Sequence, residues 1–108
     1  ETHLDSPAVK FMKKEAIFIN IGRGAIVDET ALVEALRNKD ILGCGLDVLR
    51  QEPIDMNHPL LKFDNVVIVP HIGSASRLTR DRMVQLCVNN IVAVLNKQLP
   101  ITPVKVNN

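Results

Sequence analysis

Hydrophobic positions along the chain form short unbroken runs that alternate with longer periodic stretches. Unbroken runs occupy residues 16–20 and 66–69, and a third apolar region containing two glycines spans residues 41–49. Runs of this length predict strands, and the Val/Ile run at 66–69 is typical of a strand buried on both faces of a parallel sheet. Pro70 ends that run, because proline cannot donate a hydrogen bond to a strand ladder.

Two periodic stretches predict helices near the ends of the chain. The sequence from Asp5 to Pro7 predicts a helix start, because a side-chain oxygen can cap the first amides and proline fits the first helical position. This helix is expected to run to about Lys14. A long amphipathic helix is expected from Arg77 to about Lys97. Its apolar stripe consists of Met83, Cys87, Ile91 and Val94.

A further helix is predicted between the first two strands. It is expected to begin after Asp28, whose side chain suits the N-cap position, and to end near Lys39. Its buried stripe is expected to comprise Ala31, Leu32, Ala35 and Leu36. Residues 51–62 carry prolines and little periodicity, which predicts a loop. Strands alternating with helices imply an α/β fold, in which helices flank a parallel sheet.

Composition excludes several classes of function. The chain carries 13 basic and 12 acidic residues and neither Trp nor Tyr, so neither a polyanion-binding surface nor an aromatic platform for bases is indicated and no nucleic-acid partner is expected. No apolar run approaches the roughly 20 residues that cross a membrane, so we expect a cytoplasmic protein without a membrane partner. Cys44 and Cys87 lack metal-ligand spacing and are expected to be reduced and buried, and no metal site is expected.

The length of the chain bounds its organisation. Its 108 residues make one domain at most, which is small for an enzyme that must hold both a cofactor and a substrate. The sequence opens on Glu1 without an initiator Met. We therefore expect the chain to be a piece of a longer protein.

An arginine stands in the first glycine-rich turn. Arg23 lies between Gly22 and Gly24, directly after the first predicted strand, and the two glycines are expected to supply backbone freedom for a tight turn. A planar guanidinium held there can bind the two oxygens of a carboxylate, and a surface arginine beside a helix is an equal alternative. Neither this turn nor the glycine pair at 43–45 completes the dinucleotide phosphate fingerprint.

Three further polar residues follow strands. His71 stands just past the end of an interior strand, where open α/β sheets place ligands, and is interpreted as a proton donor. Glu52 can stabilise the protonated ring and fix its tautomer, although a loop glutamate is more often simply solvated. Asp47, inside an apolar stretch, needs a donor, either a cofactor amide or neighbouring backbone amides. With Arg23, these residues converge on one sheet edge. The other histidines are expected to be structural or solvated: His3 and His58.

Four linked motifs resemble the D-isomer-specific 2-hydroxyacid dehydrogenase family. They are INIGRGAIVDETALVEAL (19–36), GLDVLRQEP (45–53), NHPLL (57–61) and NVVIVPHIGSAS (65–76). The resemblance extends over nearly all of the chain. It implies that residues 1–108 form the C-terminal half of a Rossmann-like NAD(P)-binding domain with the long C-terminal helix, the N-terminal part of the parent protein being absent.

The resemblance also implies roles for individual residues. In the family, the arginine of the RG turn, the glutamate of the EP segment and the histidine of PHIG are catalytic, and they match Arg23, Glu52 and His71. Asp47 matches the aspartate that faces the nicotinamide. Positions that match the cofactor site are Ile21, Gly22, Arg23, Asp47, His71, Gly73 and Ser74.

The implied activity is NAD(P)-dependent reduction of a 2-keto acid to a D-2-hydroxy acid. The NHPLL and PHIGSAS segments with Thr79 and Arg80 look most like glyoxylate and hydroxypyruvate reductases, which favours NADP over NAD. A homodimer is expected, and the chain alone is expected to be inactive and to bind cofactor weakly. The alternative is a non-catalytic, cofactor-sensing module similar to the transcriptional corepressors that resemble this family.

Overall fold

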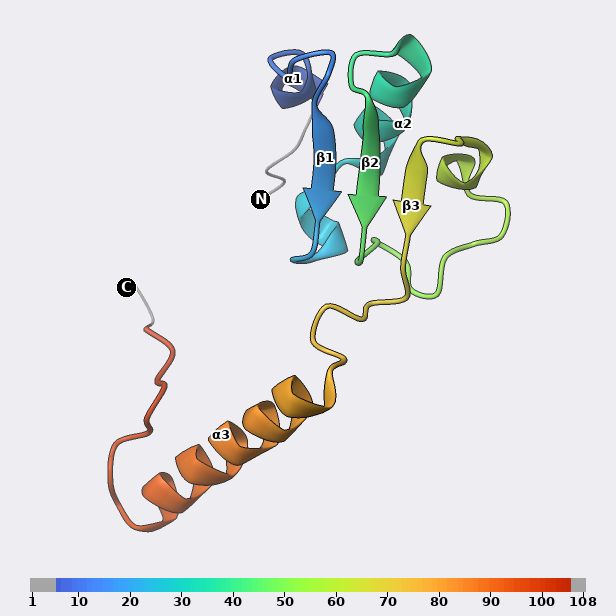
Figure 1. Cartoon of the computed structure of the whole chain (residues 1–108). Coiled ribbons are helices and arrows are strands. Elements are labelled where there is room, and N and C mark those ends of the chain that lie inside the picture. The colour runs from blue at the N-terminus through green and yellow to red at the C-terminus, as the bar shows by residue number, and fades with distance from the viewer. Residues whose placement is uncertain (1–5, 106–108) are drawn as a thin grey trace. The chain divides into compact units, whose positions relative to one another are not determined.

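The structure is a computed structural model that describes residues 6–105, and it divides into two units, residues 1–73 and residues 74–108 (Figure 1). The expected N-cap, Asp5, lies outside the described residues. In chain order the helices and strands are α1 (Ser6–Val9), β1 (Ile17–Asn20), η1 (Gly24–Ile26), α2 (Glu29–Asn38), β2 (Gly43–Leu46), η2 (Pro59–Lys62), β3 (Val66–Ile68) and α3 (Arg77–Leu95), where η marks a 3₁₀ helix.

The first unit is built on a parallel sheet with the strand order β1-β2-β3. One row of paired residues, Phe18, Cys44 and Val66, crosses all three strands. This row belongs to the face that packs on the core, in which α2 contributes the buried stripe. The structure therefore confirms the α/β class and the parallel sheet.

Helix α2 begins and ends close to the predicted positions. Asp28 caps it, because its Oδ1 accepts hydrogen bonds from the amides of Thr30 at 3.0 Å and Ala31 at 3.2 Å. Lys39 terminates it in the left-handed conformation, with φ of 58°. The predicted stripe is buried: Ala31, Leu32, Ala35 and Leu36.

The opposite face of the sheet is exposed. Ile19 pairs with Gly45, which pairs with Val67, and the two large side chains of this row are 66% and 64% exposed. The prediction that β3 is buried on both faces is therefore wrong. The reason is that the hydrophobic core of this unit lies on one side of the sheet, so alternate residues of β3 point away from it.

Several boundaries differ from the predictions. Helix α1 ends at Val9 rather than near Lys14, because the chain passes into turns in which the amides of Phe11 and Met12 donate three residues back. Strand β2 is shorter than the apolar region 41–49, and the expected loop contains η2.

Some glycines allow neighbouring atoms to lie where a Cβ would stand, and the glycines do not adopt unusual dihedral angles. No glycine among residues 6–105 has a positive φ, so the freedom expected of Gly22 and Gly24 is not used. Gly43 instead permits close approach, since a Cβ there would stand 2.5 Å from the carbonyl oxygen of Asn65. The close approach expected from the two glycines of β2 is therefore confirmed at Gly43 but not at Gly45, where a Cβ would be 3.8 Å from Ile19 Cγ1.

The second unit contains α3, which begins where Ser76 Oγ accepts a hydrogen bond from the Thr79 amide at 3.2 Å. The predicted apolar stripe is not buried: Met83 is 52% exposed and Ile91 59%, and Cys87 is exposed as well. The predicted burial of Cys87 is therefore wrong. One helix followed by an irregular tail offers little surface against which α3 can pack in its own unit. None of the helices within residues 6–105 is both long and apolar enough to cross a membrane.

Candidate active site

His71 lies in the segment that follows β3. Its backbone adopts the left-handed region with φ of 56°, and its amide donates to the carbonyl of Val69 at 3.0 Å. Non-glycine residues seldom occupy this region, and they do so at functional sites as well as at helix ends such as Lys39. The conformation turns the chain directly after Pro70, and the imidazole stays 47% exposed.

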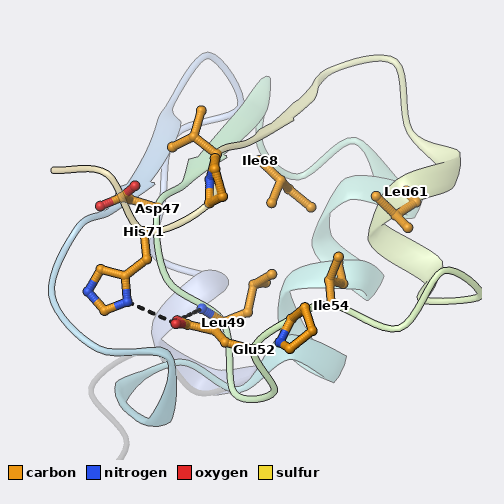
Figure 2. A pocket seen from close by; sticks show the side chains of 10 residues that line it. Asp47, Leu49, Glu52, Ile54, Leu61, Ile68 and His71 are labelled. Carbon is orange, nitrogen blue, oxygen red and sulfur yellow. Dashed lines mark hydrogen bonds and ion pairs between the residues drawn. The ribbon is translucent and has the colours of Figure 1, made fainter. Parts of the chain in front are cut away.

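Glu52 pairs with His71, as predicted. Its Oε2 lies 2.8 Å from His71 Nδ1, while its Oε1 accepts a hydrogen bond from the Leu49 amide at 3.0 Å (Figure 2). Both donors stabilise the carboxylate form. The Leu49 amide, followed by the hydrogen bond from His71, therefore lowers the pKa of Glu52 below its ordinary value of 4.5.

Asp47 organises the loop that carries the imidazole. It follows β2 and is only 7% exposed, and its Oδ1 and Oδ2 accept hydrogen bonds from the amides of Ile72 at 2.6 Å and Gly73 at 2.8 Å. Backbone amides, one of the two kinds of donor considered for this carboxylate, thus bind it. They come from the end of the neighbouring strand rather than from Asp47's own segment.

A cavity of about 470 Å³ adjoins these acidic residues. Its lining consists of Asp47, Leu49, Glu52, Pro53, Ile54, Leu61, Ile68, Val69, Pro70 and His71. In Figure 2, the Nδ1 of His71 faces Glu52 and its other ring nitrogen points away from the apolar side chains of the cavity. The ring nitrogen that does not bind Glu52 is thus on the far side of the pair from this cavity.

Asn20 shapes the turn that contains Arg23. Its Oδ1 accepts a hydrogen bond from the Gly22 amide at 3.0 Å, and its Nδ2 donates one to the Arg23 carbonyl at 3.1 Å. Asn20 is only 4% exposed, so these two bonds satisfy a buried polar side chain. Arg23 Nη1 donates to the Gly22 carbonyl at 2.8 Å, and Arg23 is not among the residues that line the cavity. Asn20 was not predicted as a site residue. The sequence feature that could have identified it is a polar residue at the end of the apolar run 16–20, two residues before Gly22.

The expected cofactor positions are distributed over the ends of the strands. Ile21, 74% exposed, and Gly22 follow β1, while Asp47 follows β2 and Gly73 comes after β3. Ser74 begins the second unit and is not placed relative to the others. Within residues 6–105, no three His, Cys, Asp or Glu side chains gather in a way that could hold a metal ion.

Residues 1–73 match the family described as "D-isomer specific 2-hydroxyacid dehydrogenase, NAD binding domain". The chain belongs to this family. Among curated relatives of this chain, a glyoxylate reductase of Thermofilum pendens is 48% identical over 97 residues, which are 90% of this chain and 29% of the relative. A glyoxylate/hydroxypyruvate reductase B of Enterobacter sp. is 50% identical over 98 residues, 89% of this chain and 30% of the relative.

A solved structure is similar to this chain as well. It is an NADPH-dependent glyoxylate/hydroxypyruvate reductase from Sinorhizobium meliloti in complex with NADP and malonate, with a TM-score of 0.85 and 42% identity over 94% of this chain and 31% of that one. The chain therefore spans about 30% of the length of these relatives. The family match covers residues 1–73, which include all three strands of the described sheet and the segments that follow them.

Proposed function

We propose that this chain supplies the acid–base part of an active site that reduces a 2-keto acid, glyoxylate or hydroxypyruvate, to a D-2-hydroxy acid with NAD(P)H. The observation that carries the proposal is the hydrogen-bonded pair of Glu52 and His71 at the carboxyl end of the sheet. Relatives named glyoxylate and glyoxylate/hydroxypyruvate reductases, about half identical over most of the chain, support the choice of substrates.

Glu52 orients the imidazole of His71 in this proposal. Its lowered pKa keeps the carboxylate ionised, so its Oε2 accepts from Nδ1–H of His71. When the imidazole is protonated, its second proton is on Nε2, the nitrogen that faces away from Glu52 and from the apolar side chains of the cavity. His71 donates this proton to the oxygen of the 2-keto group as that oxygen gains charge.

Arg23 binds the substrate carboxylate in this proposal. Its guanidinium hydrogen-bonds only to the Gly22 carbonyl within the described part of the chain, which leaves N–H groups of its planar fork for a two-point contact. The buried Asn20 fixes the turn on which Arg23 stands. A rigid turn keeps the clamp at a constant position and lowers the entropy lost on binding.

The residues present fit a nicotinamide cofactor. Because the three strands are parallel, Ile21, Gly22, Asp47 and Gly73 all lie beyond their carboxyl ends, where sheets of this class bind dinucleotides. A Cβ built at Gly22 would be in ordinary van der Waals contact, at 3.6 Å, with Asn20 Oδ1 and Ile26 Cδ1, and Ile21 offers an exposed apolar side chain. The reduced cofactor, NADPH by likeness to the reductase solved with NADP, supplies the hydride.

The test is the rate of keto-acid reduction by the full-length protein that carries this chain. Replacing the proton donor, His71→Ala, is expected to lower kcat with glyoxylate and hydroxypyruvate by about 10²- to 10⁴-fold. Arg23→Ala is expected to raise KM for the keto acid. Arg37→Ala is a matched control, because the side chain of Arg37 is exposed on α2 and has no hydrogen-bond or ion-pair partner among the described residues. An unchanged kcat in His71→Ala would rule out the proton-donor role.

The separate chain is expected to lack this activity, since it spans about 30% of its relatives' length. We also expect it to bind NADPH weakly. Micromolar binding of NADPH to the 108-residue chain in calorimetry would contradict this expectation.

A further inference from the structure

Glu29, the first residue of α2, joins two segments that are distant in sequence. Its Oε1 accepts a hydrogen bond from the Arg50 amide at 2.7 Å, and its Oε2 lies 3.1 Å from His58 Nε2. The side chains of Glu29 and His58 are 16% and 22% exposed, compared with 39% for Glu52. This second acid–imidazole pair is thus better shielded from water than the proposed catalytic pair.

The hydrogen bonds of His58 fix its tautomer. Its Nδ1 accepts from the Leu60 amide at 3.2 Å, which caps η2. A ring nitrogen that accepts a hydrogen bond carries no hydrogen, so the proton of the neutral ring resides on Nε2 and is donated to Glu29 Oε2. Both nitrogens of His58 are therefore used in holding the start of η2 to α2.

The peptide between Leu49 and Arg50 is held from two sides. A Cβ at Gly24 would overlap the Leu49 carbonyl and the Arg50 amide, so the backbone of the Arg23 turn lies directly against this peptide. Glu29 accepts from the Arg50 amide, and the Leu49 amide donates to Glu52 Oε1. One short stretch of main chain thus connects the turn of the proposed carboxylate clamp with the proposed catalytic pair.

We propose that Glu29, oriented by His58, is a positioning residue for the reaction. It fixes the Leu49–Arg50 main chain and thereby the carboxylate of Glu52 relative to His71. This inference rests on the proposed function, because it assigns to Glu29 an effect on the step that His71 carries out. Misplacement of a reacting group by about 1 Å can cost about 100-fold in rate, so a residue outside the site can control kcat.

The first test is Glu29→Gln in the full-length protein. A glutamine offers one acceptor oxygen where the carboxylate offers two, so either the Arg50 amide or His58 Nε2–H faces an amide nitrogen. We expect kcat to fall about 10- to 100-fold with the KM for NADPH unchanged. The control is Glu34→Gln on the same helix, since the side chain of Glu34 is exposed and makes no hydrogen bond within residues 6–105.

A second variant covers the case in which Glu29→Gln does not fold. His58→Asn retains an acceptor for the Leu60 amide, as in an Asx turn, and removes the donor to Glu29. His58→Asn is expected to lower kcat by a smaller factor than Glu29→Gln does. If both variants keep the kcat of the Glu34→Gln control, the positioning role is wrong.

The double variant His71→Ala with Glu29→Gln separates this proposal from the proposed function. If Glu29 acts through the Glu52–His71 pair, the combined loss of kcat is smaller than the product of the two single losses. A combined loss equal to that product overturns the inference while leaving the role of His71 intact. If His71→Ala alone has no effect on kcat, both proposals fail together.

A spectroscopic readout is independent of activity. Nitrogen-15 spectra of the histidine rings in this chain are expected to show His58 as the Nε2–H tautomer, and to lose that pattern in Glu29→Gln. An Nδ1–H tautomer of His58 in the unsubstituted chain would contradict the arrangement on which the positioning role depends.

Discussion

Asp47 and Gly73 are in direct contact: Oδ2 of Asp47 accepts a hydrogen bond from the Gly73 amide at 2.8 Å, and a Cβ at position 73 would stand 2.9 Å from the same oxygen. The contact ties the residue that follows β2 to the segment that follows β3. His71 stands two residues before Gly73, so its loop is held by a buried carboxylate. The position of the imidazole therefore depends on a residue in another strand's loop.

Asp47→Asn is expected to destabilise the first unit. Asparagine has one oxygen, so the amide of Ile72 or of Gly73 loses its acceptor and meets an NH₂ group in a buried site. An unsatisfied buried donor costs about 1–3 kcal/mol. Urea unfolding followed by circular dichroism measures this loss. The control is Asp64→Asn, because Asp64 is exposed and has no hydrogen-bond partner in the described part of the chain; equal unfolding free energies for both variants would contradict the prediction.

The pKa of Glu52 is expected to stay below 4.5 even without the imidazole. The Leu49 amide is the larger cause of the lowering, and it is retained in His71→Ala. Because the folded-state pKa is depressed, the stabilisation from the ionised carboxylate is present above 4.5 and is lost as the pH falls through the lower, folded value. A titration of the Glu52 carboxyl carbon by NMR tests this, and a return to 4.5 in His71→Ala would show that His71 is the main cause.

The two cysteines are expected to differ in reactivity. Burial raises the pKa of Cys44 to about 11, so its thiolate is scarce near pH 8, whereas Cys87 is exposed on α3. In the native chain, a thiol-reactive dye at pH 8 is expected to label one cysteine quickly. Cys87→Ser should remove the fast phase, and Cys44→Ser should keep it; rapid labelling of both thiols would be the contrary result.

The exposed face of the sheet is expected to promote self-association of this chain. β1 and β3 are the edges of the described sheet, and Ile19 and Val67 are exposed on the same face. Ile19→Lys should lower the apparent mass in sedimentation velocity at high concentration. Phe11→Lys serves as the control, because Phe11 is 90% exposed but lies outside the sheet. A strictly monomeric unsubstituted chain would disprove this expectation.

Local signals were sufficient for much of the fold. The Val/Ile run predicted β3 because continuous β-branched residues favour extended chain, and Asp28 predicted the start of α2 because its side chain caps the next amides. The pairing of Glu52 with His71 followed from the parallel sheet, whose strands end at one edge. In each case the relevant interaction is short-range or is fixed by strand direction.

The remaining features depend on tertiary packing that sequence spacing does not encode. Glu29 and Arg50 are 21 residues apart, and Glu29 and His58 are 29 apart, so no periodic pattern links them. The exposure of Cys87 could not be predicted either, because an apolar stripe shows which face of a helix can be buried and not what buries it.

The hydrogen bond from the Leu49 amide to Glu52 Oε1 spans three residues, and the two side chains between them, Arg50 and Gln51, are exposed. Side chains at these two positions are thus free to vary as long as the main chain keeps its length and position 50 keeps the amide that donates to Glu29, which excludes proline there. One added residue would move the carboxylate out of reach of either the Leu49 amide or the imidazole. For protein engineering, this stretch is a spacer whose composition can be rewritten and whose residue count cannot.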